Sequence, residues 1–147
     1  MERIKPYLTF RGRTNRKPYW LTFLSLIGVY FVAGLLGYSI PVAGPIAAAI
    51  LVIGALWVSV ATLVRRLHDR SKGGWWLIPM YLPVVILSVL AAGAEGAGEA
   101  EAAAGLNILS LPFSIWVFVE LGCLRGTRGQ NRFGPDPLAP SPAEVFG

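Results

Sequence analysis

The residues of this chain whose types and spacing suit chemistry fall in three short polar segments. The first contains Arg13, the second contains the run Arg65-Arg-Leu-His-Asp69, and the third contains Asn131. An arginine guanidinium binds a phosphate or a carboxylate through two parallel hydrogen bonds. Six residues therefore form the candidate binding site for an anionic group: Arg13, Arg65, Arg66, His68, Asp69 and Asn131.

The neighbours His68 and Asp69 also invite an acid–base interpretation, because histidine titrates near neutral pH and a carboxylate can orient its ring. Adjacent residues on a helix, however, point about 100° apart. We therefore expect Asp69 to close a turn, or to pair with Arg65 or Arg66. An enzyme would need His68 as base with Asp69 or Asp136 beside it, and it ranks third among the functions considered below.

A metal or cofactor site is not predicted, since the chain contains one His and one Cys and these do not supply a ligand cluster. Nucleic-acid binding is not predicted either. The formal net charge is +5, but no known reader motif is present.

The elements that must position the polar segments are long apolar stretches. Of the 147 residues, 54% are hydrophobic and only 14% are charged, whereas soluble domains average about 25% charged residues. Each stretch approaches the roughly 20 residues that a helix needs to cross a bilayer. The predicted crossings are 20–40, 46–64, 75–92 and 106–124. The expected fold is an all-α, integral membrane four-helix bundle.

The positive charges predict how this bundle lies in the membrane. All thirteen Lys and Arg residues fall in the three polar segments, and none lies in Pro41–Pro45 or Gly93–Gly105. Cytoplasmic loops carry the excess of Lys and Arg, so we expect both termini to be cytoplasmic. Residues 1–19 then form a basic cytoplasmic arm that is not a cleaved signal peptide. Residues 125–147 form a cytoplasmic tail that is disordered after about residue 138, and Gly93–Gly105 is an outward-facing spacer loop.

The third and fourth apolar stretches contain residues that are unusual in a membrane helix. The third stretch is short and contains Pro79 and Pro83, so a re-entrant hairpin is the alternative to a full crossing. The fourth contains Glu120, a charge that is costly inside a membrane helix. We expect Glu120 to pair with Arg65 or Arg66 and so to hold the fourth helix against the second; a proton or cation relay is the alternative.

The three polar segments also carry a family resemblance. They are similar to the patterns F-x-G-R followed by Y-W, R-R-L-H-D followed by G-W-W, and G-x-x-G-x-N-x-[FY]-G-x-D-P. The matching residues are Phe10, Gly12, Arg13, Tyr19 and Trp20; then Arg65 to Asp69 and Gly74 to Trp76; then Gly126, Gly129, Asn131, Phe133, Gly134, Asp136 and Pro137. In these residues the chain resembles the bacterial inner-membrane family known as domain of unknown function 805. Gly73 departs from the family, which often has Ser there. The resemblance implies an inner-membrane location and no established activity.

The expected function is that of a non-enzymatic accessory or interaction module. Its cytoplasmic face would bind anionic lipid headgroups or a protein partner, since basic residues at the cytoplasmic leaflet are attracted to anionic lipid. A small transporter or channel is the alternative, because Pro79, Pro83 and Pro112 could open helix backbone onto a cavity. A homo-oligomer is also compatible with these sequence features.

Overall fold

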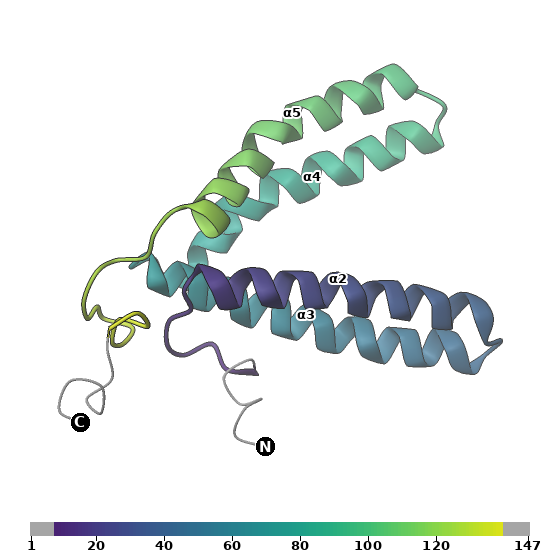
Figure 1. Cartoon of the computed structure of the whole chain (residues 1–147). Coiled ribbons are helices and arrows are strands. Elements are labelled where there is room, and N and C mark those ends of the chain that lie inside the picture. The colour runs from purple at the N-terminus through teal and green to yellow at the C-terminus, as the bar shows by residue number, and fades with distance from the viewer. Residues whose placement is uncertain (1–7, 140–147) are drawn as a thin grey trace. The chain divides into compact units, whose positions relative to one another are not determined.

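Two antiparallel helical hairpins make up most of the computed structural model, which describes residues 8–139 (Figure 1). The helices are α2 (Arg16–Ser39), α3 (Ala43–Asp69), α4 (Leu77–Gly96) and α5 (Ala100–Phe118), with a 3₁₀ turn η1 (Gly74–Trp76) before α4 and a π-helical turn η2 (Val119–Cys123) after α5. Apart from an isolated bridge between Asn131 and Gly134, the described residues contain no β-structure. The prediction of an all-α fold is confirmed.

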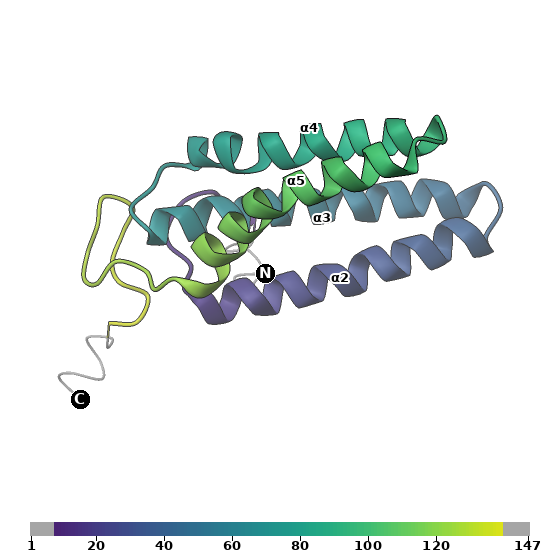
Figure 2. The ribbon, with the colours of Figure 1, turned by 90° about the horizontal axis from the view of Figure 1, so that it is seen from above.

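The chain divides into two units. Unit 1 contains α2 and α3 together with the described segments 8–15 and 125–139, and unit 2 contains η1, α4, α5 and η2. The paired helices of each unit run side by side in both views of the ribbon (Figures 1 and 2). The chain thus leaves unit 1 after Lys72, builds unit 2, and returns to unit 1 at Arg125.

Within residues 8–139, four helical stretches are long and apolar enough to cross a membrane: Arg16–Ser39, Ala43–Asp69, Gly74–Gly96 and Ala100–Cys123. Only 6–17% of the residues in their most apolar windows are buried inside the structure. Leu24, Phe31 and Ile53 are among the large apolar side chains that are left exposed. Such surfaces need lipid around them, so the structure agrees with an integral membrane protein.

The connection Pro41–Pro45, left between the predicted crossings 20–40 and 46–64, is shorter in the structure than expected. α2 ends at Ser39 and α3 already begins at Ala43, so Pro45 lies in the first turn of α3, where a missing N–H breaks no helical hydrogen bond. Gly44 packs against the backbone of Leu36, and a Cβ at this position would overlap the Leu36 carbonyl. The small residue therefore allows the two helices to approach closely at this end.

The helices also extend further than the apolar stretches. α3 continues through the basic run to Asp69, which the sequence interpretation treated as loop. α4 continues to Gly96 and α5 begins at Ala100, so most of the expected spacer Gly93–Gly105 is helical. Arg, Ala and Glu are good helix formers and extend a helix that has already been nucleated. Only three residues separate α4 from α5.

The prolines do not interrupt the helices of unit 2. Pro79 lies in the first turn of α4, while Pro83 and Pro112 lie inside α4 and α5. α4 runs without a reversal from Leu77 to Gly96, which is not the path of a re-entrant hairpin. The predicted disorder after about residue 138 falls almost wholly outside the described residues, as does the start of the basic arm.

Candidate functional site

The segment 125–139 docks on the C-terminal end of α3 within unit 1. The last carbonyls of a helix lack helical donors, and here the Asp69 carbonyl accepts hydrogen bonds from the backbone N–H of Thr127 (2.8 Å) and from its Oγ1 hydroxyl (3.0 Å). The Arg70 guanidinium donates to the carbonyl of Arg125 (2.7 Å). The returning chain therefore caps α3 and closes unit 1.

The carboxylate of Asp69 lies at the centre of this docking. Its Oδ1 accepts a hydrogen bond from Nε of Arg13 (3.1 Å) and is 3.0 Å from the NH2 atom of the same guanidinium. Its Oδ2 is 2.6 Å from NH1 of Arg66. All three side chains are at most 3% exposed. One buried carboxylate thus binds two buried guanidinium groups, and we call Arg13, Arg66 and Asp69 the ionic cluster.

Arg13 also joins the N-terminal arm to the returning segment. Its NH1 donates to the carbonyls of Gly129 (2.6 Å) and Gly134 (3.4 Å), and its NH2 donates to the carbonyl of Thr127 (2.5 Å). A planar guanidinium has five donors in a fixed geometry. Arg13 therefore binds three carbonyls of the 125–139 segment as well as the carboxylate of Asp69.

Gly126 shows how closely the segments approach. A Cβ at Gly126 would overlap the carboxylate of Asp69. Gly129, in the same segment, has a φ of +73°, in the left-handed region where side chains are disfavoured. The glycines of the third sequence pattern thus have a steric and a conformational role here.

His68 packs in the same region without joining the ionic cluster. Its Nδ1 lies 3.1 Å from the carbonyl of Gly12, a contact in which the ring nitrogen donates. The ring stacks on Phe133 at 3.9 Å with an interplanar angle of 4°, and the guanidinium of Arg132 lies 4.7 Å from the centre of the Phe133 ring. Both oxygens of Asp69 are bound by arginine, so these contacts give no support to a His68–Asp69 acid–base pair.

Asn131 makes the third connection between the segments. Its amide nitrogen donates to the carbonyl of His68 (2.9 Å) and to Oγ1 of Thr127 (2.9 Å). Its Oδ1 accepts from the backbone N–H of Phe133 (2.9 Å). Asn131 therefore fixes both the returning segment and its own turn.

The structure brings all six candidate site residues into unit 1 but gives them different environments. The side chain of Arg65 is directed back along α3, where its Nε donates to the Ala61 carbonyl (3.3 Å) and its NH2 lies 3.5 Å from Oγ1 of Thr62. Glu120 lies in unit 2, buried within the π-helical turn η2. Its predicted pairing with Arg65 or Arg66 stays a prediction.

A pocket of about 260 Å³ adjoins the ionic cluster within unit 1. We call it the basic pocket; its lining residues are Asn15, Arg16, Lys17, Asp69, Arg125, Gly126, Thr127, Asp136 and Leu138. The sequence interpretation treated Arg16, Lys17 and Arg125 only as charges that set topology, and so did not select them. Asn15, a residue type favoured before a helix, and Pro18, three residues later, are the signals in the sequence that could have placed the start of α2 here.

Asp136 is the acidic residue at the side of the pocket that the returning segment forms. Its Oδ1 accepts from the N–H of Leu138 (3.0 Å) and its Oδ2 from the N–H of Gly129 (2.9 Å). These two hydrogen bonds, together with the nearby charges of Arg13 and Arg125, hold the pKa of Asp136 below its ordinary value. The carboxylate is therefore ionised at neutral pH.

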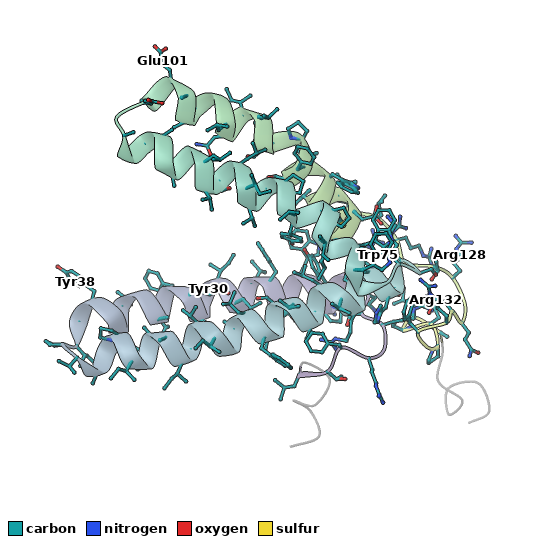
Figure 3. The ribbon with its side chains drawn as sticks, turned by 180° about the vertical axis from the view of Figure 1, so that it is seen from behind. Tyr30, Tyr38, Trp75, Glu101, Arg128 and Arg132 are labelled. Carbon is teal, nitrogen blue, oxygen red and sulfur yellow. The ribbon has the colours of Figure 1, made fainter. Side chains whose placement is uncertain are left out.

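Residues 8–139 contain no group of three or more His, Cys, Asp or Glu side chains placed to hold a metal ion. The arrangement at the end of unit 1 instead combines buried arginines that bind protein oxygens with exposed basic side chains. Arg128 and Arg132 lie in the returning segment, where Figure 3 labels them, and both are exposed.

Comparison with known proteins places the whole pattern in one family. The sequence pattern of the family described as "Protein of unknown function (DUF805)" matches residues 7–135. "Inner membrane protein YhaH" of Escherichia coli (strain K12) is 31% identical over 141 residues, covering 91% of each chain. From the same organism, "Uncharacterized protein YiiR" is 28% identical, covering 87% of this chain and 85% of the relative, and "Inner membrane protein YhaI" is 27% identical, covering 91% and 90%. No solved structure matches.

These relatives and the four membrane-length helices agree on location. The chain is a multi-pass protein of the bacterial inner membrane, as its hydropathy and its polar motifs predicted.

Proposed function

The chain belongs to the family of proteins of unknown function DUF805, and we propose a function for it. It is a non-enzymatic module of the inner membrane whose cytoplasmic face binds anionic lipid headgroups. One observation carries the proposal. The ionic cluster binds three polar segments into one structured end of unit 1, and exposed basic side chains surround it. The exposed side chains are Arg11, Arg16, Lys17, Arg125, Arg128 and Arg132.

The two groups of arginines have different roles in this proposal. Arg13 and Arg66 are buried and bind Asp69, so they hold the face together. The other six basic side chains are exposed at the same end of unit 1. Each Lys or Arg close to an anionic leaflet contributes about 1 kcal/mol of attraction. Six such residues give the face a strong preference for anionic over neutral lipid.

The orientation follows from the same residues. The basic segments lie at the start of α2, at the end of α3 and after η2, whereas the α2–α3 turn and the α4–α5 turn contain no Lys or Arg. By the positive-inside rule, the structured end and both termini face the cytoplasm. A protein partner that binds this face would then be cytoplasmic.

The test is the thermal stability of the purified protein in detergent, with added phosphatidylglycerol or phosphatidylcholine, over a series of salt concentrations. A ligand that binds the folded state raises the unfolding temperature, and salt screens exposed charges. We expect phosphatidylglycerol to stabilise the protein more than phosphatidylcholine, and this difference to shrink as salt rises. Equal stabilisation by both lipids at every salt concentration would overturn the proposal.

A matched variant identifies the residues responsible. Replacing Arg11 and Arg128 with Gln removes two exposed charges outside the basic pocket. We expect this variant to lose part of the phosphatidylglycerol effect while it keeps the unfolding temperature of the wild type in pure detergent.

Transport is the second candidate function, favoured by Glu120. This carboxylate is buried in a π-helical turn at the end of a membrane-length helix, and both π-helical turns and intramembrane charges mark functional sites in other proteins. Flux of protons or cations through proteoliposomes that is lost in Glu120→Gln would favour the transporter over the binding module.

A further inference from the structure

The basic pocket has the features of a built binding site beyond general attraction to a charged surface. Its volume of about 260 Å³ is slightly below the range of drug-sized ligand sites and suits a small polar group. Three separate segments of unit 1 form it: the start of α2, the end of α3 at Asp69 and the returning segment 125–139. The pocket lies at the start of a membrane-length helix, and lipid headgroups lie at this depth in the bilayer.

One part of the pocket lining is cationic. Arg16 and Lys17 open the first turn of α2, and Arg125 comes from the returning segment; all three are exposed. The positive end of the α2 dipole adds to their potential. The carboxylate of Asp69, which also lines the pocket, is already bound by Arg13 and Arg66. This side of the pocket therefore suits a phosphate group.

Another part of the lining offers an acceptor. The ionised carboxylate of Asp136 lines the pocket, and each of its oxygens has capacity for a further hydrogen bond beyond the backbone N–H that it binds. The only donor of inorganic phosphate is a hydroxyl on the phosphorus itself, so this ion has no donor-bearing group beyond the phosphate that could reach Asp136.

We propose that the basic pocket binds one phosphodiester headgroup that carries its own hydrogen-bond donor. Arg16, Lys17 and Arg125 bind the phosphate, and the carboxylate of Asp136 accepts a hydrogen bond from the group beyond it. The hydroxyls of phosphatidylglycerol and the ammonium of phosphatidylethanolamine both meet this requirement. Phosphatidylcholine has the same phosphodiester without an N–H or O–H donor, and phosphatidic acid has neither a diester nor a donor-bearing headgroup.

The inference rests on the proposed function and deepens it, since it assigns one class of lipid headgroup to one pocket on the same face. Attraction to the exposed basic surface depends on the net charge of the lipid, whereas binding in the pocket depends on a hydrogen-bond donor in the lipid headgroup. Phosphatidylethanolamine, which has no net charge, therefore separates the two: it should bind the pocket and should gain nothing from the exposed arginines.

The experiment is native mass spectrometry of the full-length protein in detergent with equal amounts of one added lipid at a time. We expect the wild type to retain one phosphatidylglycerol or phosphatidylethanolamine per chain, at least ten-fold more than phosphatidylcholine or phosphatidic acid. A water-soluble glycerophosphoglycerol should compete with the lipid, and inorganic phosphate should not. Equal retention of all four lipids, or equal competition by inorganic phosphate, would overturn the proposal.

Three variants connect the result to the pocket. Lys17→Gln combined with Arg125→Gln should lose the retained lipid by about ten-fold or more. Asp136→Asn should instead lose the discrimination against phosphatidic acid, because it removes the negative charge that repels a phosphomonoester. Lys72→Gln removes a positive charge from the same unit outside the pocket and should keep the wild-type pattern. Thermal unfolding of each variant shows that it is folded.

The two proposals fail in different ways. If Lys17→Gln with Arg125→Gln retains as much lipid as the wild type, the pocket assignment is wrong, even if phosphatidylglycerol still stabilises the protein in a salt-dependent manner. If the salt-dependent preference is absent but one donor-bearing lipid is retained and lost in the variant, the pocket stands without the surface attraction.

Discussion

In unit 1, side chains far apart in the sequence hold one another through charged hydrogen bonds, whereas the buried residues of the α4–α5 hairpin of unit 2 are apolar, Met80 among them. Asp69 in α3 binds Arg13 from the N-terminal arm, and Arg13 in turn binds carbonyls of the returning segment. In unit 2, Ala91 of α4 and Ala103 of α5 are buried, and the Ser114 hydroxyl donates to a carbonyl one turn earlier on its own helix.

This difference predicts which single substitutions reduce the stability of the protein. A buried ion network leaves an uncompensated charge when one member is removed. An apolar hairpin in lipid has interchangeable contacts with its helix partner and with the acyl chains. We therefore expect unit 1 to be sensitive to changes that preserve size, and unit 2 to tolerate them.

The largest effect is expected for Asp69→Asn, which leaves the buried guanidinium groups of Arg13 and Arg66 without their counter-charge. Breaking a buried ion pair in this way costs about 3–5 kcal/mol. Thermal unfolding in detergent, followed by tryptophan fluorescence, should show a large fall in the unfolding temperature. Ser110→Ala in α5 is the control and should change stability by less than about 0.5 kcal/mol.

A double-mutant cycle of Asp69→Asn with Arg13→Gln gives a second test of the same network. The two changes remove members of one network, so the double variant should lose less than the sum of the two single losses. Simple additivity would show that Arg13 and Asp69 do not act together.

An intermediate loss of stability is expected for Glu120→Gln. This loss would contradict the contrast between the two units. If Glu120 pairs with Arg65 or Arg66 as the sequence predicts, a charged hydrogen bond also holds unit 2, and its loss costs about 1.5–3 kcal/mol. Glu101→Gln is the matched control, because Glu101 is exposed at the start of α5 (Figure 3). Equal unfolding temperatures for the wild type and Glu120→Gln would exclude the pairing.

The smallest changes in stability are expected for two glycines, one in each unit, when each is replaced by Ala. Gly126→Ala places a methyl group against the Asp69 carboxylate and should destabilise the protein by about 1–3 kcal/mol. Gly105 lies inside α5 with open space around its Cβ position, so Gly105→Ala should be neutral or stabilise by about 0.5–1 kcal/mol. Similar unfolding temperatures for the two variants would show that the approach of Gly126 to Asp69 is not tight.

The helices and the location were readable from the sequence because both depend on local composition. A stretch such as 20–40 is long and apolar enough to require lipid wherever it lies in the fold. The ends of the helices were less well predicted, since Arg65 and Arg66 can end an apolar stretch without ending a helix. The sequence placed the motif residues Asp69 and Asn131 in one candidate site, and the structure places both in unit 1, but their contacts could not be read from the sequence.

By itself, the sequence determined a four-helix membrane protein of this family with its polar residues in three segments. Only the tertiary structure decided which arginines are buried against Asp69 and which surround a pocket. Arg13 and Arg16 are three residues apart and of the same type, yet one is buried in the ionic cluster and the other lines the basic pocket. The reason is physical: Arg13 meets Gly129, 116 residues away, and a contact at that separation forms only after the chain has returned to unit 1.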